Sequence, residues 1–306
     1  MKISIIGAGN VGALSAMRIA QYSLGDIFLV DIAKGLSEGK ALDLADAQAV
    51  LGIDYNIRGS DDINSIIDSD IIVVTAGLAR KPGMTREELL AKNSRILKDV
   101  CLNIKKLASQ AIVIVVTNPL DLMTYLALKV TGFDKNKVLG MGSSLDSSRF
   151  ANLIAQELKL PASSVETMVI GAHGEGMLPL ARHTRIKGVN LEEFLSDEKM
   201  EELTKRTVAR GAEIVALLGS GSAFFAPSAA VAQMVKAIAK DEKKTLGACA
   251  PLNGEYGIKD ICLGVPCRIG REGIEKIIEL DLTDKEKTEL SHSADSIRSL
   301  LKQLSF

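Results

Sequence analysis

The chain has 306 residues, 47% of them hydrophobic, and its 37 lysines and arginines nearly balance its 38 aspartates and glutamates. This length suits two domains better than one simple core, and the balanced charge gives no reason to expect binding to nucleic acid or to a membrane surface. No apolar stretch is long enough for a membrane span, because Pro227, Ser228 and Gln233 interrupt even the alanine-rich run after Phe225.

The N-terminal residues predict a strand, a glycine-rich turn and a helix. The apolar run 2–7 leads into Gly7-Ala-Gly-Asn-Val-Gly12 and then into helix-forming residues 13–20. Glycines at this spacing allow a tight turn and a close approach of a pyrophosphate to the helix N-terminus. A second strand, 26–31, ends in an acidic residue about 20 positions on, where a ribose-binding carboxylate belongs. The segment predicts a dinucleotide site formed by Gly7, Gly9, Asn10, Val11, Gly12 and Asp31.

Asp31 also indicates which dinucleotide binds. A carboxylate accepts hydrogen bonds from a ribose diol and repels a 2′-phosphate, so this residue favours NAD over NADP. Lys34 lies close enough in the sequence to leave NADP as an alternative.

Strands and helices alternate through the first half of the chain. After Asp31 the pattern predicts a helix at 35–51, strands at 54–58 and 70–75, a helix at 85–109 and a strand at 111–117. Continuous Ile/Val runs such as the last are typical of strands covered on both faces. This alternation predicts an α/β fold with a Rossmann-type doubly wound parallel sheet.

The loop that follows the strand 70–75 carries two arginines, Arg80 and Arg86, on either side of Pro82-Gly83. A guanidinium group matches the geometry of a carboxylate, and Pro-Gly marks a turn or hinge that would let the loop close over a ligand. The loop is therefore either a receiver for small acids or a solvated surface loop.

The rhythm changes beyond about residue 142. Long helical patterns at 144–158, 196–218, 228–239 and 283–304 are mixed with short strands near 166–170 and 262–269. We therefore expect a Rossmann domain over residues 1–142 and a mixed α+β substrate domain over residues 143–306, with no evident linker between them.

Three histidines are present, and His173 is the best candidate for a catalytic base. It lies among small residues in Gly171-Ala-His-Gly-Glu-Gly176, which would let a ligand approach closely, although a structural histidine is the alternative. An imidazole can exchange a proton with an alcohol or ketone near neutral pH. His292 is expected on the surface of the C-terminal helix, and His183 on a basic, half-exposed strand.

An imidazole base needs a partner, and Asp146 is the candidate. On a helix Asp146 and Arg149 share a face, so one could orient His173 while the other clamps a substrate carboxylate. The alternative is a salt bridge on the helix surface.

The four cysteines, at positions 101, 249, 262 and 267, are scattered in apolar contexts and form no C-x-x-C motif. They are typical of structural thiols in a reducing compartment, and we expect no metal site. The first strand begins at Lys2, so we expect no targeting peptide and a cytoplasmic protein.

Together these segments resemble the lactate/malate dehydrogenase family over essentially the whole chain. The resemblance is carried by Gly7–Gly12, Asp31, Thr75-Ala-Gly77, Thr117-Asn-Pro119, Leu145-Asp-Ser-Ser-Arg-Phe150 and Gly171-Ala-His-Gly-Glu175. The loop from Arg80 to Arg86 resembles the malate branch, because lactate enzymes carry glutamine at the position of Arg80. The chain as a whole is similar to the subgroup of malate dehydrogenases that resemble lactate dehydrogenases.

The resemblance implies roles for the residues that match. His173 would exchange the hydroxyl proton, Asp146 would hold His173, and Arg149 would grip the C1 carboxylate. Arg86 would polarise the ketone, and Arg80 would pair with the second carboxylate.

Further residues would complete the site by the same resemblance. Asn118 would orient the substrate and the nicotinamide, and its bond to Pro119 would be cis. Asn93 and the Val116 backbone would contact the cofactor. NAD is the implied cofactor and (S)-malate and oxaloacetate the implied substrates, as in the tricarboxylic acid cycle.

The resemblance also implies a homodimer or homotetramer, packed through the helix that starts near Gly35 and includes Gly39, Ala41 and Leu42. Two alternatives in function remain open. One is a dehydrogenase for another 2-hydroxy acid, such as lactate. The other is a non-catalytic dinucleotide sensor, which is disfavoured because the base, its carboxylate and all three arginines are present.

Overall fold

The computed structural model describes residues 1–78 and 85–302. Its first half forms six parallel strands in the order β3-β2-β1-β4-β5-β6. The strands are β1 (Lys2–Ile6), β2 (Asp26–Val30), β3 (Ile57–Ser60), β4 (Ile71–Val74), β5 (Ile112–Val115) and β6 (Val138–Gly140). The predicted doubly wound parallel sheet is confirmed. Because the strand order reverses between β1 and β4, their carboxyl ends border the crevice where ligands bind in such sheets.

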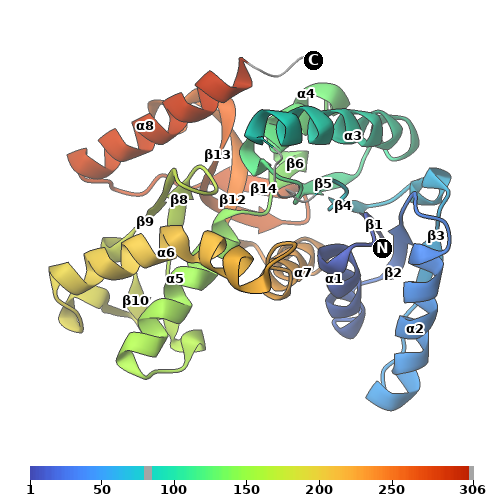
Figure 1. Ribbon diagram of the computed structural model, residues 1–306, viewed down its shortest axis with the longest axis horizontal. Helices are drawn as coiled ribbons and strands as arrows, with labels where there is room; N and C mark the ends of the chain where they lie inside the picture. The colour runs from blue at the N-terminus through green and yellow to red at the C-terminus, as the bar shows by residue number, and fades with distance from the viewer. Residues whose placement is uncertain (79–84, 303–306) are drawn as a thin grey trace.

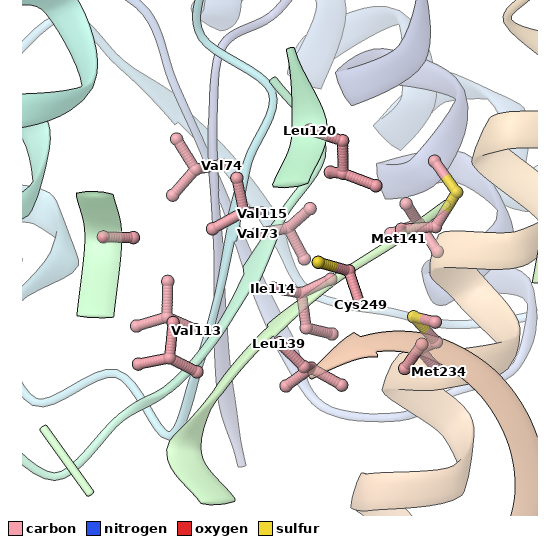
Figure 2. Packing of buried hydrophobic residues seen from close by; sticks show 14 of the residues in the cluster. Val73, Val74, Val113, Ile114, Val115, Leu120, Leu139, Met141, Met234 and Cys249 are labelled. Carbon is pink, nitrogen blue, oxygen red and sulfur yellow. The ribbon is translucent and has the colours of Figure 1, made fainter. Parts of the chain in front are cut away.

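Helices cover both faces of this sheet. They are α1 (Asn10–Gln21), α2 (Leu36–Leu51), α3 (Arg86–Leu107) and α4 (Leu120–Thr131). Figure 1 shows α3 and α4 together on one side of the sheet and α1 on the other, beside α7 (Phe225–Ala239). All residues of β4 and β5 are buried, as their apolar runs predicted. Figure 2 shows their valines packed with Leu139 of β6 and Met234 of α7.

The second half contains the remaining elements. Its helices are α5 (Ser143–Leu158), α6 (Asp197–Leu218), α7 and α8 (Asp284–Leu301). Its strands are β7 (Val165–Glu166), β8 (Val169–Gly171), β9 (Met177–Pro179), β10 (Arg185–Ile186), β11 (Val189–Asn190), β12 (Lys244–Asn253), β13 (Lys259–Gly270) and β14 (Gly273–Ile277). Three of these strands, in the order β11-β10-β7, form a separate small sheet.

The large sheet does not end at β6, which the sequence pattern did not predict. Cys249 of β12 pairs with Gly140 of β6 in antiparallel sense, and β13, β8 and β9 follow in the same sheet. The sequence pattern also did not predict α4, β6, β12 and β14. β12 contains Gly247 and Pro251 among small residues that disfavour strands; its long antiparallel pairing with β13 determines its conformation.

The strand expected near 54–58 is present but lies at Ile57–Ser60. The prediction for His183 was wrong, because this residue lies in a 3-10 turn, Ala181–His183, rather than on a strand. Among the described helices none combines the length and the apolar character that a bilayer crossing needs.

Candidate active site

The glycine-rich turn joins β1 to α1 at the carboxyl edge of the sheet. Gly7 has φ +107°, a conformation that glycine tolerates, and its carbonyl oxygen accepts a hydrogen bond from Thr75 Oγ1 at 2.9 Å. A Cβ on Gly12 would clash with the Gly7 carbonyl, whereas a Cβ on Gly9 would meet nothing within 4 Å. The turn is therefore packed on its inner side and open at Gly9, as a backbone cradle for a pyrophosphate requires. Asn10 and Val11 are the first residues of α1.

Asp31 lies directly beside this turn. Its Oδ2 accepts a hydrogen bond from the Ala8 N–H at 2.6 Å and its Oδ1 accepts one from the Ala33 N–H at 2.9 Å. Lys40, on α2, donates to the Ala8 carbonyl at 2.6 Å. Lys34 is exposed. The carboxylate thus stands next to the open turn, where a ribose diol would reach it.

Asn93 of α3 ties together the loops that follow β4 and β5. Its Oδ1 accepts from the Leu78 N–H at 2.8 Å, and its Nδ2 donates to the Asn118 carbonyl at 2.7 Å. The Asn118–Pro119 peptide is cis, which confirms that prediction. The Asn118 side chain is exposed at the end of β5, and Val116 precedes it. Asn93 therefore holds the edge of the crevice in place.

The second half of the site centres on Asp146, near the start of α5. Its Oδ2 lies 2.7 Å from His173 Nδ1, and its Oδ1 lies 3.2 Å from Arg149 Nη1. The side chains of His173, Arg149 and Asp146 are 17%, 10% and 2% exposed. The Asp146–Arg149 pair is thus buried, and Asp146 also contacts His173, so the pair is not a salt bridge on the helix surface.

The surroundings favour the charged form of His173. Burial lowers the pKa of His173, but the charge of Asp146, the hydrogen bond to it and the charge of Asp121 outweigh burial and raise the pKa above its ordinary value. A base with such a partner can accept a proton and hold it.

Arg149 is a buried guanidinium with spare donors. Burial lowers the pKa of Arg149, and Asp146 opposes this change. Its Nε is buried and has no hydrogen-bond partner in the described part of the chain. A small carboxylate would supply the missing acceptor.

Sequence reasoning missed two residues that support His173. Asp121, in the first turn of α4, accepts a hydrogen bond from the His173 N–H at 2.9 Å. Ser293, on α8, bonds to Ala172 and Gly176 on either side of the histidine. The carboxylate that follows Thr117-Asn-Pro119 so closely was a usable signal for Asp121. Nothing in the local pattern around Ser293 pointed to the site.

Two predicted site residues are not placed. Arg80 lies outside the described residues, as do Lys81, Pro82 and Gly83 between it and Arg86. Arg86 begins α3, which Thr85 and Glu88 cap reciprocally, but its side chain is not described. The structure describes only the ends of this loop: Leu78, which is bonded to Asn93, and Thr85, which caps α3.

The other candidates lie elsewhere. His292 is exposed on α8, and His183 is partly exposed, with Nε2 3.0 Å from the Asp281 carbonyl oxygen. All four cysteines are buried and free, as expected of structural thiols. Over residues 1–78 and 85–302 no group of three or more His, Cys, Asp or Glu side chains is arranged to hold a metal ion.

Known proteins share both halves of this arrangement. Residues 1–140 match the lactate/malate dehydrogenase NAD binding domain, and residues 143–305 match the α/β C-terminal domain of the same family. The chain is 50% identical over 303 residues to the malate dehydrogenase of Methanosarcina barkeri, with 99% of each protein covered.

Solved structures of malate and lactate dehydrogenases have the same fold as this chain. The malate dehydrogenase of Salinibacter ruber superposes with a TM-score of 0.95 at 40% identity, covering 99% of this chain and 97% of that one. The lactate dehydrogenase of Cryptosporidium parvum, complexed with lactic acid and nicotinamide adenine dinucleotide, gives a TM-score of 0.94 at 38% identity, covering 99% and 98%. The chain belongs to the lactate/malate dehydrogenase family.

Proposed function

We propose that this protein catalyses the reversible NAD-dependent oxidation of (S)-malate to oxaloacetate. The observation that carries this proposal is the buried group formed by His173, Asp146 and Arg149, which combines a base, its orienting carboxylate and an anion-binding guanidinium. The full-length identity to malate dehydrogenases supports it.

In this mechanism His173 accepts the proton of the C2 hydroxyl while the substrate is oxidised. Asp146 orients the imidazole and stabilises the imidazolium that forms. Arg149 binds the C1 carboxylate through the N–H groups that Asp146 leaves free. In the reverse direction His173 returns the proton to the ketone oxygen.

The three remaining polar side chains act on the substrate from the segments that follow β4 and β5. Arg86 stabilises the charge that develops on the ketone oxygen, and Arg80 pairs with the second carboxylate. Asn118, at the end of β5, orients the substrate oxygen. Arg80 and Arg86 keep these roles as proposals from the sequence, since their side chains are not described.

The cofactor is NAD, which supplies the hydride acceptor when bound. The open turn at Gly9 and the adjoining Asp31 carboxylate fit its pyrophosphate and ribose. Gly7, Asn10, Val11 and Gly12 shape this turn. Asn93, which links the loops after β4 and β5, and the Val116 backbone would make further contacts with the cofactor.

Lactate is the alternative substrate, because a lactate dehydrogenase is among the similar structures. A kinetic matrix of oxaloacetate and pyruvate against NADH and NADPH separates the possibilities. We expect the highest kcat/KM for oxaloacetate with NADH. A higher kcat/KM for pyruvate would favour a lactate enzyme, and equal use of NADPH would show that Asp31 does not select the cofactor.

We further propose two domains, 1–142 and 143–306, in a cytoplasmic homodimer or homotetramer. α2 supports the assembly, because Leu42 and Val50 on this helix are 67% and 89% exposed. Exposed apolar side chains gathered on one helix are typical of an interface.

A further inference from the structure

The turn that carries His173 is held from three helices. Residues 171–176 connect β8 to β9, and Gly171 and Gly174 adopt positive φ. From α8, Ser293 Oγ accepts from the Ala172 N–H and donates to the Gly176 carbonyl, both at 2.8 Å. α5 holds the imidazole ring through Asp146, and α4 holds the His173 N–H through Asp121.

The contact from Asp121 differs from that of Ser293 because it brings a second carboxyl group. Asp121 is 3% exposed. Its Oδ2 accepts the His173 N–H, while its Oδ1 is buried and has no hydrogen-bond partner in the described residues. The mechanism above makes no use of this buried acid.

The charges of His173, Asp146, Arg149 and Asp121 indicate what Asp121 does. Arg149 already neutralises one carboxylate, because it pairs with Asp146. If Asp121 is ionised, the group carries one negative charge in excess while His173 is neutral, and becomes neutral when His173 is protonated. Buried charges are least costly when they are balanced, so this arrangement favours the imidazolium.

Two features favour the ionised form of Asp121. It lies in the first turn of α4, where the helix dipole stabilises negative charge, and its bond from the His173 N–H is stronger to a carboxylate than to an acid.

The titratable groups that face Asp121 act in both directions. Burial raises the pKa of Asp121 above its ordinary value, and the charge of Asp146 acts in the same direction. The positive charge of His173, the His173 N–H and the Cys249 thiol oppose this rise, so the carboxylate is favoured most when His173 is protonated. Cys249 is itself next to the Cys262 thiol, and burial raises the pKa of Cys249 well above its ordinary value. The Cys249 thiol is therefore uncharged, and protonated His173 is the cation that favours the carboxylate form of Asp121.

We propose that Asp121 is a positioning residue that remains ionised and supplies the second negative charge that stabilises protonated His173. This inference rests on the proposed function, in which His173 is the acid–base group. Asp121 thus acts on His173 through its charge, whereas Ser293 holds the same turn through hydrogen bonds from an uncharged hydroxyl.

The test is a direct titration of His173 in the protein without cofactor. With only three histidines, NMR of histidine-labelled protein resolves each ring, and His183→Gln and His292→Gln identify the other two. Asp121→Asn removes the charge and keeps an oxygen that accepts the His173 N–H. We expect this variant to lower the pKa of His173 by about 1 or more, the usual effect of losing a nearby opposite charge.

Ser293→Ala is the matched control, because it loosens the same turn and changes no charge. It should leave the pKa of His173 unchanged, while Asp146→Asn, the positive control, should lower that pKa further. An unchanged pKa in Asp121→Asn, or an equal shift in Ser293→Ala, would overturn the proposal.

Two further readouts complete the test. Infrared spectra of the unaltered protein near neutral pH show whether it contains a buried neutral carboxyl group, which gives a carbonyl band. If Asp121→Ser abolishes such a band, Asp121 is not ionised and the proposal is wrong. If no soluble Asp121 variant can be made, the presence of this band in the unaltered protein would itself contradict the proposal. In turnover, Asp121→Asn should shift the alkaline fall of oxaloacetate reduction to lower pH, and Ser293→Ala should lower kcat without that shift. If malate were not the substrate, all proteins would lack this activity while the NMR shift would persist.

Discussion

At the scale of single residues, the site depends on one carboxylate that serves two partners. Asp146 contacts His173 through one oxygen and Arg149 through the other. This geometry places the imidazole and the guanidinium on the two oxygens of one buried carboxylate. It supports the proposal that these three residues together bind a substrate carboxylate and exchange a proton with the neighbouring hydroxyl.

Replacing His173 with Asn should lower turnover by roughly 100-fold to 10,000-fold, the usual contribution of a positioned acid–base group. NADH affinity should be nearly unchanged, because the glycine-rich turn and Asp31 lie on other elements. Steady-state kinetics and NADH fluorescence titration measure the two effects. His292→Asn, on the exposed face of α8, is the control; a His173→Asn enzyme that kept half its activity would mean that another base acts.

The pH dependence follows from the raised pKa of His173. Malate oxidation needs the neutral imidazole, so its kcat/KM should rise as pH increases through a value above the ordinary histidine pKa. Oxaloacetate reduction needs the imidazolium, so its kcat/KM should fall over the same range. Rate profiles in both directions test this, and a common midpoint at or below the ordinary pKa would contradict it.

Arg80 carries the prediction on specificity, from the sequence alone. Oxaloacetate differs from pyruvate by one carboxylate, and a site built around a polar group rejects the analogue that lacks it by about 10,000-fold or more. Arg80→Gln should greatly reduce kcat/KM for oxaloacetate and raise it for pyruvate, since glutamine leaves no unpaired charge. If the ratio of the two did not change, Arg80 would not contact the second carboxylate.

At the scale of elements, the turn between β1 and α1 contains one glycine that is needed for stability and another that we expect to be needed for cofactor binding. Gly12→Ala places a Cβ against the Gly7 carbonyl, which is backbone and cannot move aside. We expect a loss of stability of about 1–3 kcal/mol, as for other overpacked positions. Gly9→Ala meets nothing within 4 Å, so it should keep the melting temperature and weaken NADH binding.

Thermal unfolding and NADH titration of both variants measure this pair of effects. Equal NADH affinity in Gly9→Ala and the unaltered protein would show that the cofactor does not pass over this turn. The two glycines are three residues apart in one motif, yet only one of them faces open space.

At the scale of the whole molecule, α2 carries exposed apolar side chains, and we propose that a second subunit covers them. Leu42→Glu places a charge on the apolar face that we propose to be buried between subunits. Analytical ultracentrifugation should show a smaller species than the unaltered protein. Val189→Glu, on β11 and 46% exposed, is the control and should leave the mass unchanged. A Leu42→Glu protein of unaltered mass would place the interface elsewhere.

The local parts of this protein were determined by the sequence itself. The glycine-rich turn, the acidic residue after β2 and the buried strands β4 and β5 are all visible as short motifs or apolar runs, because their causes lie within a few residues. The cis bond before Pro119 was expected from the family resemblance. The predicted parallel sheet and the family followed from their order, and both were confirmed.

Only the tertiary structure decided how the two halves meet. β12 has a composition that disfavours strands, and its conformation comes from pairing with β13 and β6. Asp121 lies 52 residues before His173 and Ser293 lies 121 residues after Ala172. Such contacts leave no periodic pattern in a sequence, because strand register and helix packing, rather than local propensity, bring the groups together.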